Sequence, residues 1–523
     1  MVAVGQGELL VLKTARGRIG LAATVMASAT AMLDSTVANV ALPEIGRDFG
    51  ADVAGLQWVI TGYLLTLASF ILLGGAAGDR WGRRRVFVVG AIWFGLASVA
   101  CGLAPSLEVL IAARILQGVG AALVTPSSLA LLQASFVPDD RGRAVGAWSG
   151  LGGLAGAIGP FVGGWLIDGP GWRWAFLVNL PLLGAAVLAT KVFPETGTDR
   201  SGHFDVAGAL LAVLCLAPLT WALTEATTIG WGSPRILGAL ALSVGAAVSF
   251  VVRQRRAAVP LVPPVLFRSR NFTVLNIVTF VLYAALGAEF FLSVYQLQVT
   301  SGWSALAAGS ALLPATVIML IGSSWSGQLA TRIGPRPQLV IGPLLVAAGL
   351  VALAGIDADA DWLVDVAPGA VLFGLGLVTF VAPLTASVMG SVDEVHVSTA
   401  SGVNNAVART GGLLAVALIP PLVGLTTAVG SDETTEAYRT AMFVIAGLAV
   451  VAALISAIGL RSPRSRRSAR DFTCAVDGAP LQPDPRACPP VTADTAAAGL
   501  GLAGGQRAAA TVPGVQRSGS VEQ

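Results

Sequence analysis

The sequence predicts an all-α polytopic membrane protein with fourteen transmembrane helices, and three observations carry this prediction. Of the 523 residues, 55% are hydrophobic and only 12% are charged, about half of the roughly 25% that a typical soluble protein carries. Apolar runs recur along most of the chain, and a membrane helix needs about 20 such residues. One short pattern also recurs in two widely separated loops. Together these features exclude a soluble enzyme, a secreted disulfide scaffold and a nucleic-acid-binding protein.

Each predicted span is a largely apolar stretch, and the loops between the spans are short. The first six spans form a predicted N-terminal six-helix bundle, 19–193, and the last six form a C-terminal six-helix bundle, 272–460. Two inserted helices lie between the bundles, in residues 205–252. In chain order the predicted spans are 19–42, 56–78, 86–104, 107–132, 144–167, 174–193, 205–225, 235–252, 272–298, 306–329, 338–356, 363–388, 399–427 and 440–460.

The positively charged residues predict the orientation of these spans. Most of the 32 Lys and Arg residues lie in the N-terminus, 1–18, in alternate loops, and in the tail, 461–523. Because positive residues stay on the cytoplasmic side, both termini are predicted to be cytoplasmic, in a cell membrane. The start of the chain also imitates a cleavable signal peptide, but its apolar run continues to Leu42 and favours a membrane anchor. The tail is rich in Arg, Pro, Ala and Gly, a composition that predicts a disordered cytoplasmic extension.

The pattern Gly-x-x-small-x-Arg-x-Gly-x-Arg occurs twice, at residues 75–84 and at residues 327–336. The first copy follows the second predicted span, and the second copy follows the tenth. Duplicated halves are typical of transporters, so the pair predicts two related six-helix bundles. The alternative is a chance match, because arginines gather where helices leave the membrane on the cytoplasmic side.

Five further motifs lie in order along the spans. The first span holds Leu-Asp-Ser-Thr-Val-Ala-Asn-Val-Ala-Leu-Pro, and the fifth holds Gly-Pro-Phe-Val-Gly-Gly. The five motifs occupy residues 33–43, 114–122, 159–164, 172–181 and 402–409.

With the loop at 75–85, these motifs resemble the major facilitator superfamily and, within it, the fourteen-span drug:proton antiporters. The resemblance covers residues 14–460. It departs from the family pattern at Ala77, where Leu is usual, and at Ala155, where Gly often stands. It implies the major facilitator fold, with two six-helix bundles and, in this subfamily, two extra helices.

The resemblance also implies a function: proton-coupled efflux, by alternating access, of amphipathic organic compounds such as antibiotics or dyes. The expected partners are this small-molecule substrate, protons and the lipid bilayer, and we expect a monomer. None of the four cysteines forms a Cys-x-x-Cys pair, so no metal site is indicated. We expect no enzymatic activity and no cofactor, with the proton gradient as the energy source. The alternative is a dedicated exporter of one endogenous metabolite, such as a secondary metabolite or siderophore.

Asp34 lies in the middle of the first apolar run. A charged residue at the centre of a membrane helix costs about 2.5–3.5 kcal/mol on insertion scales, so its presence needs a reason. Small residues share its helix face, which can therefore pack closely against another helix or border a cavity. Removal from water favours the neutral form of a carboxyl group, so we predict that Asp34 binds and releases the coupling proton. The alternative is a structural role, bonded to its own helix or paired with Arg114.

Glu289 is a second acid within a span, in the first helix of the C-terminal bundle. Gln296 shares its helix face, and we expect both to face the central cavity that Asp34 also borders. There Glu289 could share the coupling proton or attract a cationic substrate, with structural pairing as the alternative. The resemblance gives Arg114 a role in proton coupling, because a cation shifts a nearby carboxylate's affinity for protons.

The first repeated loop is predicted to form a cytoplasmic gate. Asp79 can accept hydrogen bonds from Arg83 or from the N-terminus of a neighbouring helix, and glycines permit a tight turn. A solvated basic loop that only holds the topology is the alternative. The predicted gate residues are Gly75, Asp79, Arg80, Gly82 and Arg83.

The fifth span carries the residues that resemble the antiporter motif, Gly159, Pro160, Gly163 and Gly164. Proline kinks a helix, and glycines let a partner helix come close. Packing alone can explain such a sequence, but together with the resemblance it favours export over uptake.

The substrate cavity is predicted to lie between the bundles near the midplane of the membrane, where transporters of this kind bind their substrates. Amide side chains within the spans are candidates for lining it. The predicted cavity residues are Asn39, Gln117, Gln296 and Asn405.

Overall fold

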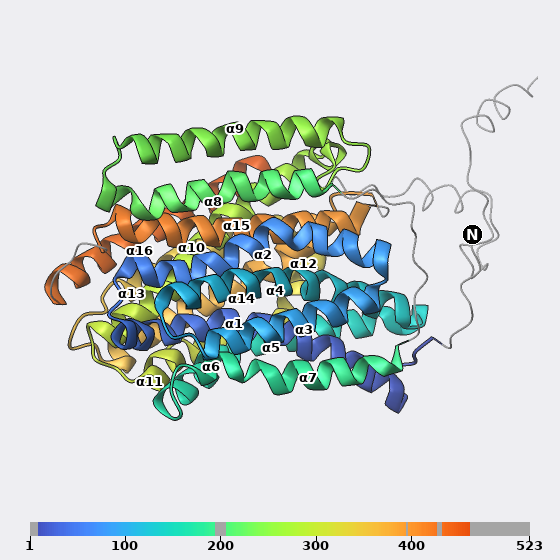
Figure 1. Cartoon of the computed structure of the whole chain (residues 1–523), viewed down its shortest axis with the longest axis horizontal. Helices are drawn as coiled ribbons and strands as arrows, with labels where there is room; N and C mark the ends of the chain where they lie inside the picture. The colour runs from blue at the N-terminus through green and yellow to red at the C-terminus, as the bar shows by residue number, and fades with distance from the viewer. Residues whose placement is uncertain (1–8, 194–204, 394–395, 426–430, 461–523) are drawn as a thin grey trace, which may run out of the picture. The chain divides into compact units, whose positions relative to one another are not determined.

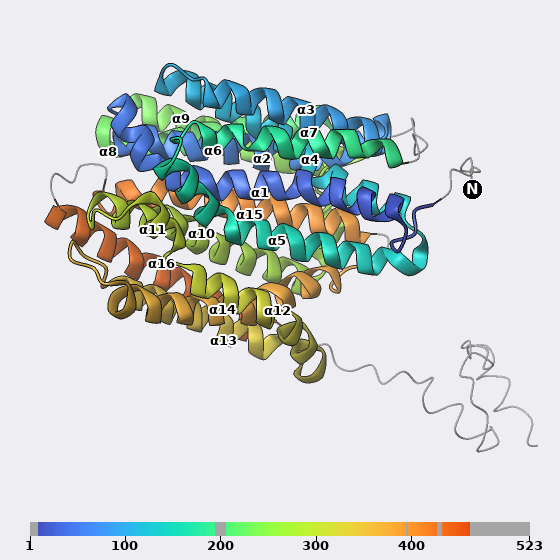
Figure 2. The ribbon, with the colours of Figure 1, turned by 90° about the horizontal axis from the view of Figure 1, so that it is seen from below.

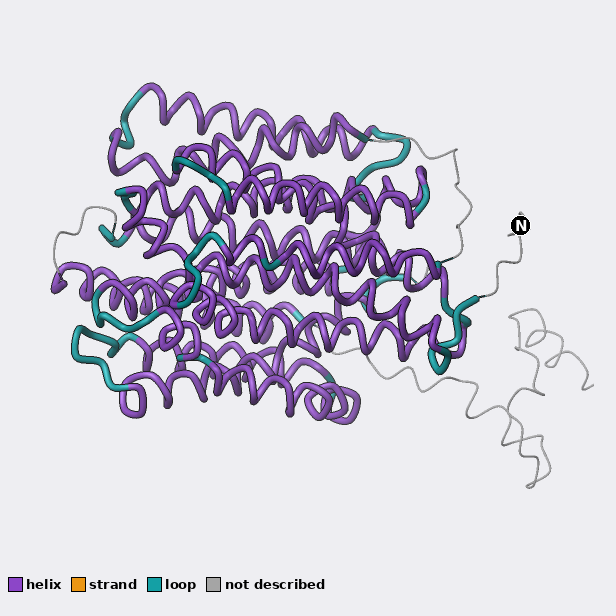
Figure 3. Tube along the Cα trace, turned by 60° about the horizontal axis from the view of Figure 1, so that its bottom comes forward, coloured by secondary structure: helices purple, strands orange, loops and turns teal. Residues whose placement is uncertain are grey.

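The computed structural model describes residues 9–193, 205–393, 396–425 and 431–460. The described residues form helices joined by loops (Figure 3), with one isolated parallel bridge between Leu10 and Phe136. The predicted disordered tail, 461–523, lies outside the described residues, as do residues 1–8.

The first bundle is built from α1 to α7. Helices α6 and α7 are two parts of one span, Trp174–Val192, which ends in the short 3-10 helix η1 (Thr190–Val192). The helices are α1 (Ala15–Phe49), α2 (Val53–Trp81), α3 (Arg83–Gly102), α4 (Leu107–Ser135), α5 (Pro138–Asp168), α6 (Trp174–Leu177) and α7 (Asn179–Ala189).

The second bundle is built from α10 to α16. Its second span is broken after Ser310, just before Pro314, and its fourth begins with the π-helix η3 (Trp362–Val366). The helices are α10 (Arg270–Val299), α11 (Ala305–Ser310), α12 (Leu313–Ile333), α13 (Pro335–Leu353), α14 (Ala367–Met389), α15 (Val397–Leu422) and α16 (Ser431–Gly459).

Local signals at the helix ends explain where the observed bounds differ from the predicted ones. Helix α1 begins earlier than the predicted span because the Thr14 side chain caps it, accepting a hydrogen bond from the backbone N–H of Gly17. It ends later, at Gly50, whose φ of 63° gives the left-handed conformation that closes a helix. Pro43 lies inside this helix, so the proline that ends the sequence motif does not end the helix.

The prediction of an all-helical polytopic membrane protein is confirmed. In the described part of the chain, thirteen helices are long and apolar enough to cross a membrane. The remaining predicted span, 144–167, corresponds to α5, which is 31 residues long.

The two bundles repeat one packing scheme. Helix α1 packs against α5 and α7 as α10 packs against α15 and α16, and the α3–α4 pair corresponds to the α13–α14 pair. Figure 2 shows α3 and α7 on one side of the described residues and α13 and α14 on the other. Both copies of the loop pattern contain a glycine with positive φ, Gly82 at 98° and Gly334 at 81°. The two loops therefore make the same turn at corresponding places.

Two further helices, α8 (Val206–Ile229) and α9 (Pro234–Arg256), connect the bundles in sequence. Helix α8 packs against α2 and α15, so it contacts both bundles, and α9 packs against α8 (Figure 1). Exposed apolar side chains such as Leu237, Val244 and Val248 cover α9. In a membrane protein such a surface faces lipid.

Glycine sets the distance between α3 and α4. A Cβ added at Gly120 would lie 2.7 Å from the backbone nitrogen of Phe94. The corresponding pair repeats this, because a Cβ added at Gly349 of α13 would lie 2.6 Å from the backbone nitrogen of Phe373 of α14. Small residues at such crossings let two membrane helices approach closely.

We therefore expect Gly120→Ala to lower the melting temperature of the purified protein, because overpacking costs about 1–3 kcal/mol. The matched control is Gly142→Ala on α5, where nothing lies within 4 Å of the added Cβ. Alanine favours a helix over glycine by about 1 kcal/mol, so the control should melt no lower than the unsubstituted protein. Equal melting temperatures for the two variants would contradict the close contact.

Candidate functional site

Asp34 of α1 and Arg114 of α4 form an ion pair inside the first bundle. Nη1 of Arg114 lies 2.6 Å from Oδ2 of Asp34, and both side chains are 0% exposed. Removing one partner of such a pair leaves a bare buried charge, which costs about 3–5 kcal/mol. Each charge is therefore stable in this buried position only because the other charge neutralises it.

Two amide side chains also bind the Asp34 carboxylate. Its Oδ1 accepts hydrogen bonds from Nε2 of Gln117 at 2.8 Å and from Nδ2 of Asn179 at 2.7 Å. Both amides also donate to the hydroxyl of Ser98 on α3, at 2.9 Å and 3.2 Å. Hydrogen bonds of this kind, together with a cation, stabilise an ionised carboxylate.

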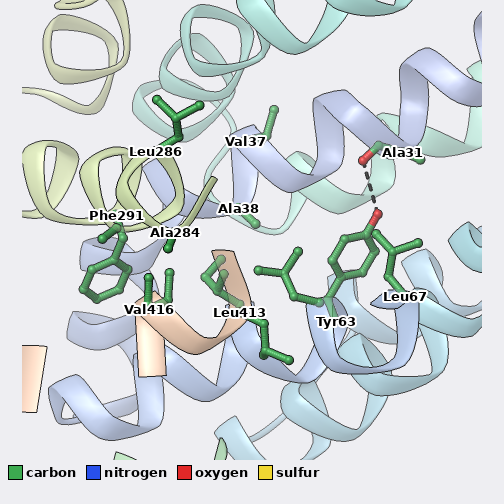
Figure 4. Close-up of a cluster of buried hydrophobic side chains, with 14 of the residues drawn as sticks. Ala31, Val37, Ala38, Tyr63, Leu67, Ala284, Leu286, Phe291, Leu413 and Val416 are labelled. Carbon is green, nitrogen blue, oxygen red and sulfur yellow. Dashed lines mark hydrogen bonds between the residues drawn. The ribbon is translucent and has the colours of Figure 1, made fainter. Parts of the chain in front are cut away.

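Arg114 links this cluster to α2. Its Nε donates to the backbone oxygen of Val59 at 3.0 Å, and its guanidinium carbon lies 4.3 Å from the centre of the Tyr63 ring, a cation–π distance. The hydroxyl of Tyr63 in turn donates to the backbone oxygen of Ala31 on α1 (Figure 4). Side chains and backbone of α1, α2, α3, α4 and α7 thus meet around one carboxylate.

This cluster could gain or lose one proton, at the carboxylate of Asp34. A proton on Asp34 would remove the anion that Arg114 neutralises, and it would turn the strongest acceptor in the cluster into a donor. Because the cluster is buried, water cannot replace the lost interactions, so the donors would be left unpaired unless they found other acceptors.

Glu289 lies on α10 and is fully buried. Neither of its carboxylate oxygens has a hydrogen-bond partner among the described residues. One turn further along the same helix, the Ser293 hydroxyl lies 3.3 Å from that of Tyr438 on α16. Gln296 donates to Ile356 and Thr435 on this side too.

This face of α10 is therefore directed at α16 and the end of α13, inside the second bundle. Glu289 therefore lies inside the second bundle and Asp34 inside the first, so the structure does not place them on one shared cavity as expected. Helix α10 has several buried faces, and a different one meets the first bundle, where Gln298 donates to the backbone oxygen of Val40 at 2.9 Å. Helical spacing identifies the residues of one face but not the neighbour of that face.

The residues of the predicted gate make their described contacts within the first bundle. Nη2 of Arg83 lies 2.9 Å from Oδ1 of Asp79, and Nη1 of Arg83 donates to the backbone oxygen of Ala130 on α4 at 3.3 Å. Asp79 is 64% exposed, so the ion pair itself contributes about 0–1 kcal/mol. Gly82 makes the turn between α2 and α3, Gly75 lies against Pro126 of α4, and Arg80 lies in the last turn of α2.

The glycines of the predicted antiporter motif lie at two helix crossings of α5. Gly159 and Gly163 pack against Thr36 and Val37 of α1, and an added Cβ at Gly163 would lie 3.0 Å from Val37. Gly164 packs against α11 of the second bundle, where an added Cβ would overlap the backbone of Leu306. The backbone of Pro160 packs against Gly309 of α11 in the same way.

Polar contacts join the two bundles at the end where α1 terminates, which we call the Phe49 end. Asp168, the last residue of α5, accepts hydrogen bonds from the first two backbone N–H groups of α11, at 3.0 Å and 2.9 Å. Gln57 of α2 donates to the backbone oxygen of Val416 of α15. An apolar cluster from α1, α2, α10 and α15, including Ala38, Ala284 and Leu413, lies between the bundles (Figure 4). The Phe49 end is thus closed in this conformation.

The four predicted cavity residues are not gathered in one place by any described contact. Gln117 and Gln296 are buried and bonded within separate bundles. Asn39 and Asn405 donate to the backbone of their own helices, to Ser35 and Ser401, and Asn405 is exposed. A hollow of about 970 Å³ lies instead in the second bundle. Its lining is mostly apolar and includes Trp303, Trp362 and Val317.

Sequence reasoning missed Ser98, Asn179 and Tyr63 as members of the cluster around Asp34. Asn179 belongs to the motif at 172–181 and was available as a candidate from the resemblance. Ser98 and Tyr63 carry no sequence signal, since hydroxyl groups are common in membrane helices and only the helix packing brings these two to Asp34.

The ion pair predicts a non-additive response to substitution. Asp34→Asn and Arg114→Gln should each lower the melting temperature, because each leaves one buried charge unpaired. The double variant Asp34→Asn/Arg114→Gln should be more stable than either single variant, because no bare charge remains. Melting of the four proteins in one detergent measures this, and additive losses would mean that the pair is not coupled.

The close contact between Gly164 of α5 and α11 predicts that this glycine keeps the Phe49 end closed. Gly164→Val should raise hydrogen–deuterium exchange in α11 (Ala305–Ser310), because the new side chain would displace that helix. Gly152→Val on the same helix is the control, since nothing lies within 4 Å of its added Cβ. Unchanged exchange in the Gly164 variant would show that this crossing does not hold the end shut.

Comparison with known proteins agrees with this architecture. The chain is 36% identical over 394 residues to the tetracenomycin C resistance and export protein of Streptomyces glaucescens, covering 75% of this chain and 73% of that protein. It is 33% identical over 484 residues to the puromycin resistance protein pur8 of Streptomyces alboniger, covering 89% and 95%. It is 34% identical over 390 residues to the multidrug resistance protein Stp of Mycobacterium tuberculosis (strain CDC 1551 / Oshkosh), covering 74% and 72%.

Solved structures share the fold at low sequence identity. A D-xylose-proton symporter superposes with a TM-score of 0.61 at 14% identity, covering 85% of this chain and 98% of the symporter. A bacterial homologue of the human lysosomal transporter Spinster gives a TM-score of 0.59 at 17% identity, covering 86% and 97%. Residues 24–416 match the family model of the Major Facilitator Superfamily. The two related bundles and this match agree, and the chain belongs to the Major Facilitator Superfamily.

Proposed function

We propose that this protein is an efflux transporter of the cell membrane that exports amphipathic organic compounds in exchange for protons. Family membership supports transport, and relatives are named for resistance to, or export of, antibiotics. The observation that carries the proton-exchange part is the buried pair of Asp34 and Arg114, a titratable charge in the first helix of a two-bundle fold. Intramembrane ionisable residues of this kind are typical of proton pathways.

The outward direction of transport is proposed from the relatives that are named for resistance and export. With both termini in the cytoplasm, as the distribution of Lys and Arg favours, the Phe49 end faces outward. In the proposed cycle, substrate enters from the cytoplasm or the inner leaflet while the Phe49 end is closed. Asn39 and Asn405 lie on helices of opposite bundles, and we assign them to the substrate path between the bundles.

Asp34 then exchanges its cationic partner for a proton during the cycle. In the conformation with the Phe49 end closed, Arg114 and the two amides bind its carboxylate. Opening of that end gives protons access to the carboxylate, and protonation releases Arg114. Because Arg114 also binds α2, its release loosens the contact between α1, α2 and α4 and favours the return. The gate role of the loop with Asp79 and Arg83 stays a prediction; in the described conformation its contacts join α2, α3 and α4.

Glu289 supplies a second proton site in the proposal. A buried carboxylate without partners is costly when ionised, so its setting suits the neutral acid. Loss of that proton in another conformation would leave an anion that attracts a cationic substrate.

The energetics of this exchange are sufficient for drug efflux. One charge that crosses 100 mV releases about 2.3 kcal/mol. Since about 1.4 kcal/mol corresponds to a tenfold concentration ratio, one proton can sustain roughly a 40-fold gradient of a neutral substrate.

A dedicated exporter of one metabolite is the second candidate. The names of relatives favour it in part, because tetracenomycin C and puromycin are single compounds. A panel of unrelated dyes and antibiotics in an expressing strain separates the two functions. Lower accumulation of several unrelated compounds supports a multidrug pump, and protection against one compound alone supports the dedicated exporter.

The decisive measurement is proton release from the purified protein when substrate is added, followed by substrate transport in proteoliposomes with an imposed pH gradient. Asp34→Asn/Arg114→Gln, which should remain folded, is expected to lose both proton release and gradient-driven transport. Glu289→Gln should impair cationic substrates more than neutral ones. Asp139→Asn, an exposed acid at the start of α5, is the control and should behave as the unsubstituted protein.

Gradient-driven transport by the folded double variant would remove Asp34 as the proton carrier. Equal losses for cationic and neutral substrates in Glu289→Gln would instead assign Glu289 a structural role.

A further inference from the structure

A basic hollow lies between the two inserted helices, outside both bundles. Its volume is about 410 Å³, more than ten times the roughly 30 Å³ that a water molecule occupies in the liquid. Its lining includes Leu211 of α8 and, from the last turns of α9, Val248, Ser249, Val252, Arg253 and Arg256. Leu211, Val248 and Val252 form the apolar part of the lining, here called the apolar wall, and Arg253 and Arg256 add two guanidinium groups.

A buried carboxylate fixes the position of one of these arginines. Nε of Arg253 donates to Oδ1 of Asp205 at 2.7 Å, and the Asp205 side chain is 2% exposed whereas that of Arg253 is 45% exposed. Gln254, also buried, donates to the second oxygen of Asp205 at 2.8 Å and accepts from the backbone N–H of Val262. The guanidinium of Arg253 is thus anchored at its Nε, while Arg253 also lines the hollow.

Asp205 is suited to this task because it stays charged. Burial by itself raises its pKa, but hydrogen bonds from Arg253, Gly208 and Gln254 outweigh burial and hold the pKa below the usual value for aspartate. Arg255 and Arg256 add positive charge in the same helix turn, so this end of α9 remains basic after Asp205 has neutralised one arginine.

The surroundings indicate the chemistry of the ligand. Helix α9 presents apolar side chains to the bilayer along its length, and three of its four arginines lie in its last turn, where a membrane helix meets the headgroup region. Guanidinium groups bind phosphate through paired hydrogen bonds, and basic pockets between membrane helices suit acidic lipid headgroups. The apolar wall of Leu211, Val248 and Val252 gives an acyl chain a place beside the charged groups.

We propose that this hollow binds one anionic phospholipid, with its phosphate on Arg253 and Arg256 and its acyl chain along the apolar wall between α8 and α9. Because α8 contacts both bundles, the lipid would lie beside an inserted helix that packs against each of them. The proposal rests on membrane embedding and not on the transported substrate.

The test is lipid retention by the full-length protein in detergent, measured by native mass spectrometry with phosphatidylglycerol or phosphatidylcholine. We expect at least tenfold tighter retention of phosphatidylglycerol, with a preference that shrinks as salt is raised. Arg256→Gln should abolish the preference, and Arg235→Gln at the opposite end of α9 should leave it unchanged. Ser249→Trp, which keeps every charge but fills the hollow, should also abolish it.

Equal retention of the two lipids, or a preference that survives both Arg256→Gln and Ser249→Trp, would overturn the proposal. Inorganic phosphate distinguishes a lipid site from a free-anion site. Displacement of the lipid by millimolar phosphate alone would assign the hollow to soluble anions and would likewise overturn it.

Discussion

A pair of opposite charges in the interior of a membrane protein needs compensating partners, and this requirement organises the first bundle, although Nη2 of Arg114 has no hydrogen-bond partner among the described residues. Arg114 neutralises Asp34 at 2.6 Å, and the donors that complete the carboxylate come from α4 and α7. Arg114 is bound in turn by the backbone of α2 and by an aromatic ring. The same contacts that make the charges tolerable therefore tie the helices together, so stability and any proton-driven movement depend on one cluster.

Close helix contacts give that cluster a rigid frame. Glycines bring α3 to α4, and the corresponding glycines bring α13 to α14. Rigid bundles are needed if a local change of charge is to move whole helices. Helix α5 plays a different part, because its glycines contact α1 on one side and α11 of the other bundle on the opposite side. It therefore couples the helix that carries Asp34 to the seal between the bundles.

The two bundles share a packing scheme but not a charge distribution. Helix α1 carries an acid with a cation and two amides, whereas α10 carries an acid with no partner among the described residues. An acid with partners is tolerated as an anion, and one without partners is tolerated as a neutral group. The duplicated architecture thus holds two buried carboxyl groups in different settings, one beside a cation and two amide donors and one without a cation.

The sequence by itself determined the number and order of the spans, because hydrocarbon accepts only long apolar helices with internally satisfied backbones. It also determined the family, because turn glycines and intramembrane charges leave short patterns such as those at 75–84 and 33–43. From the sequence, a pair between Asp34 and Arg114 was one form of the structural alternative to proton binding. The structure shows that the two side chains are paired and gives the distance between them.

Only the tertiary structure decided what each buried face meets. Helical periodicity placed Glu289 with Gln296, but the packing of α10 turned both toward α16 and away from the first bundle. Ser98 and Tyr63 entered the Asp34 cluster for the same reason, since nothing in their own sequence surroundings distinguishes them. A helix fixes the angle between its own side chains, whereas its rotation against its neighbours is set by the summed packing of all the helices around it.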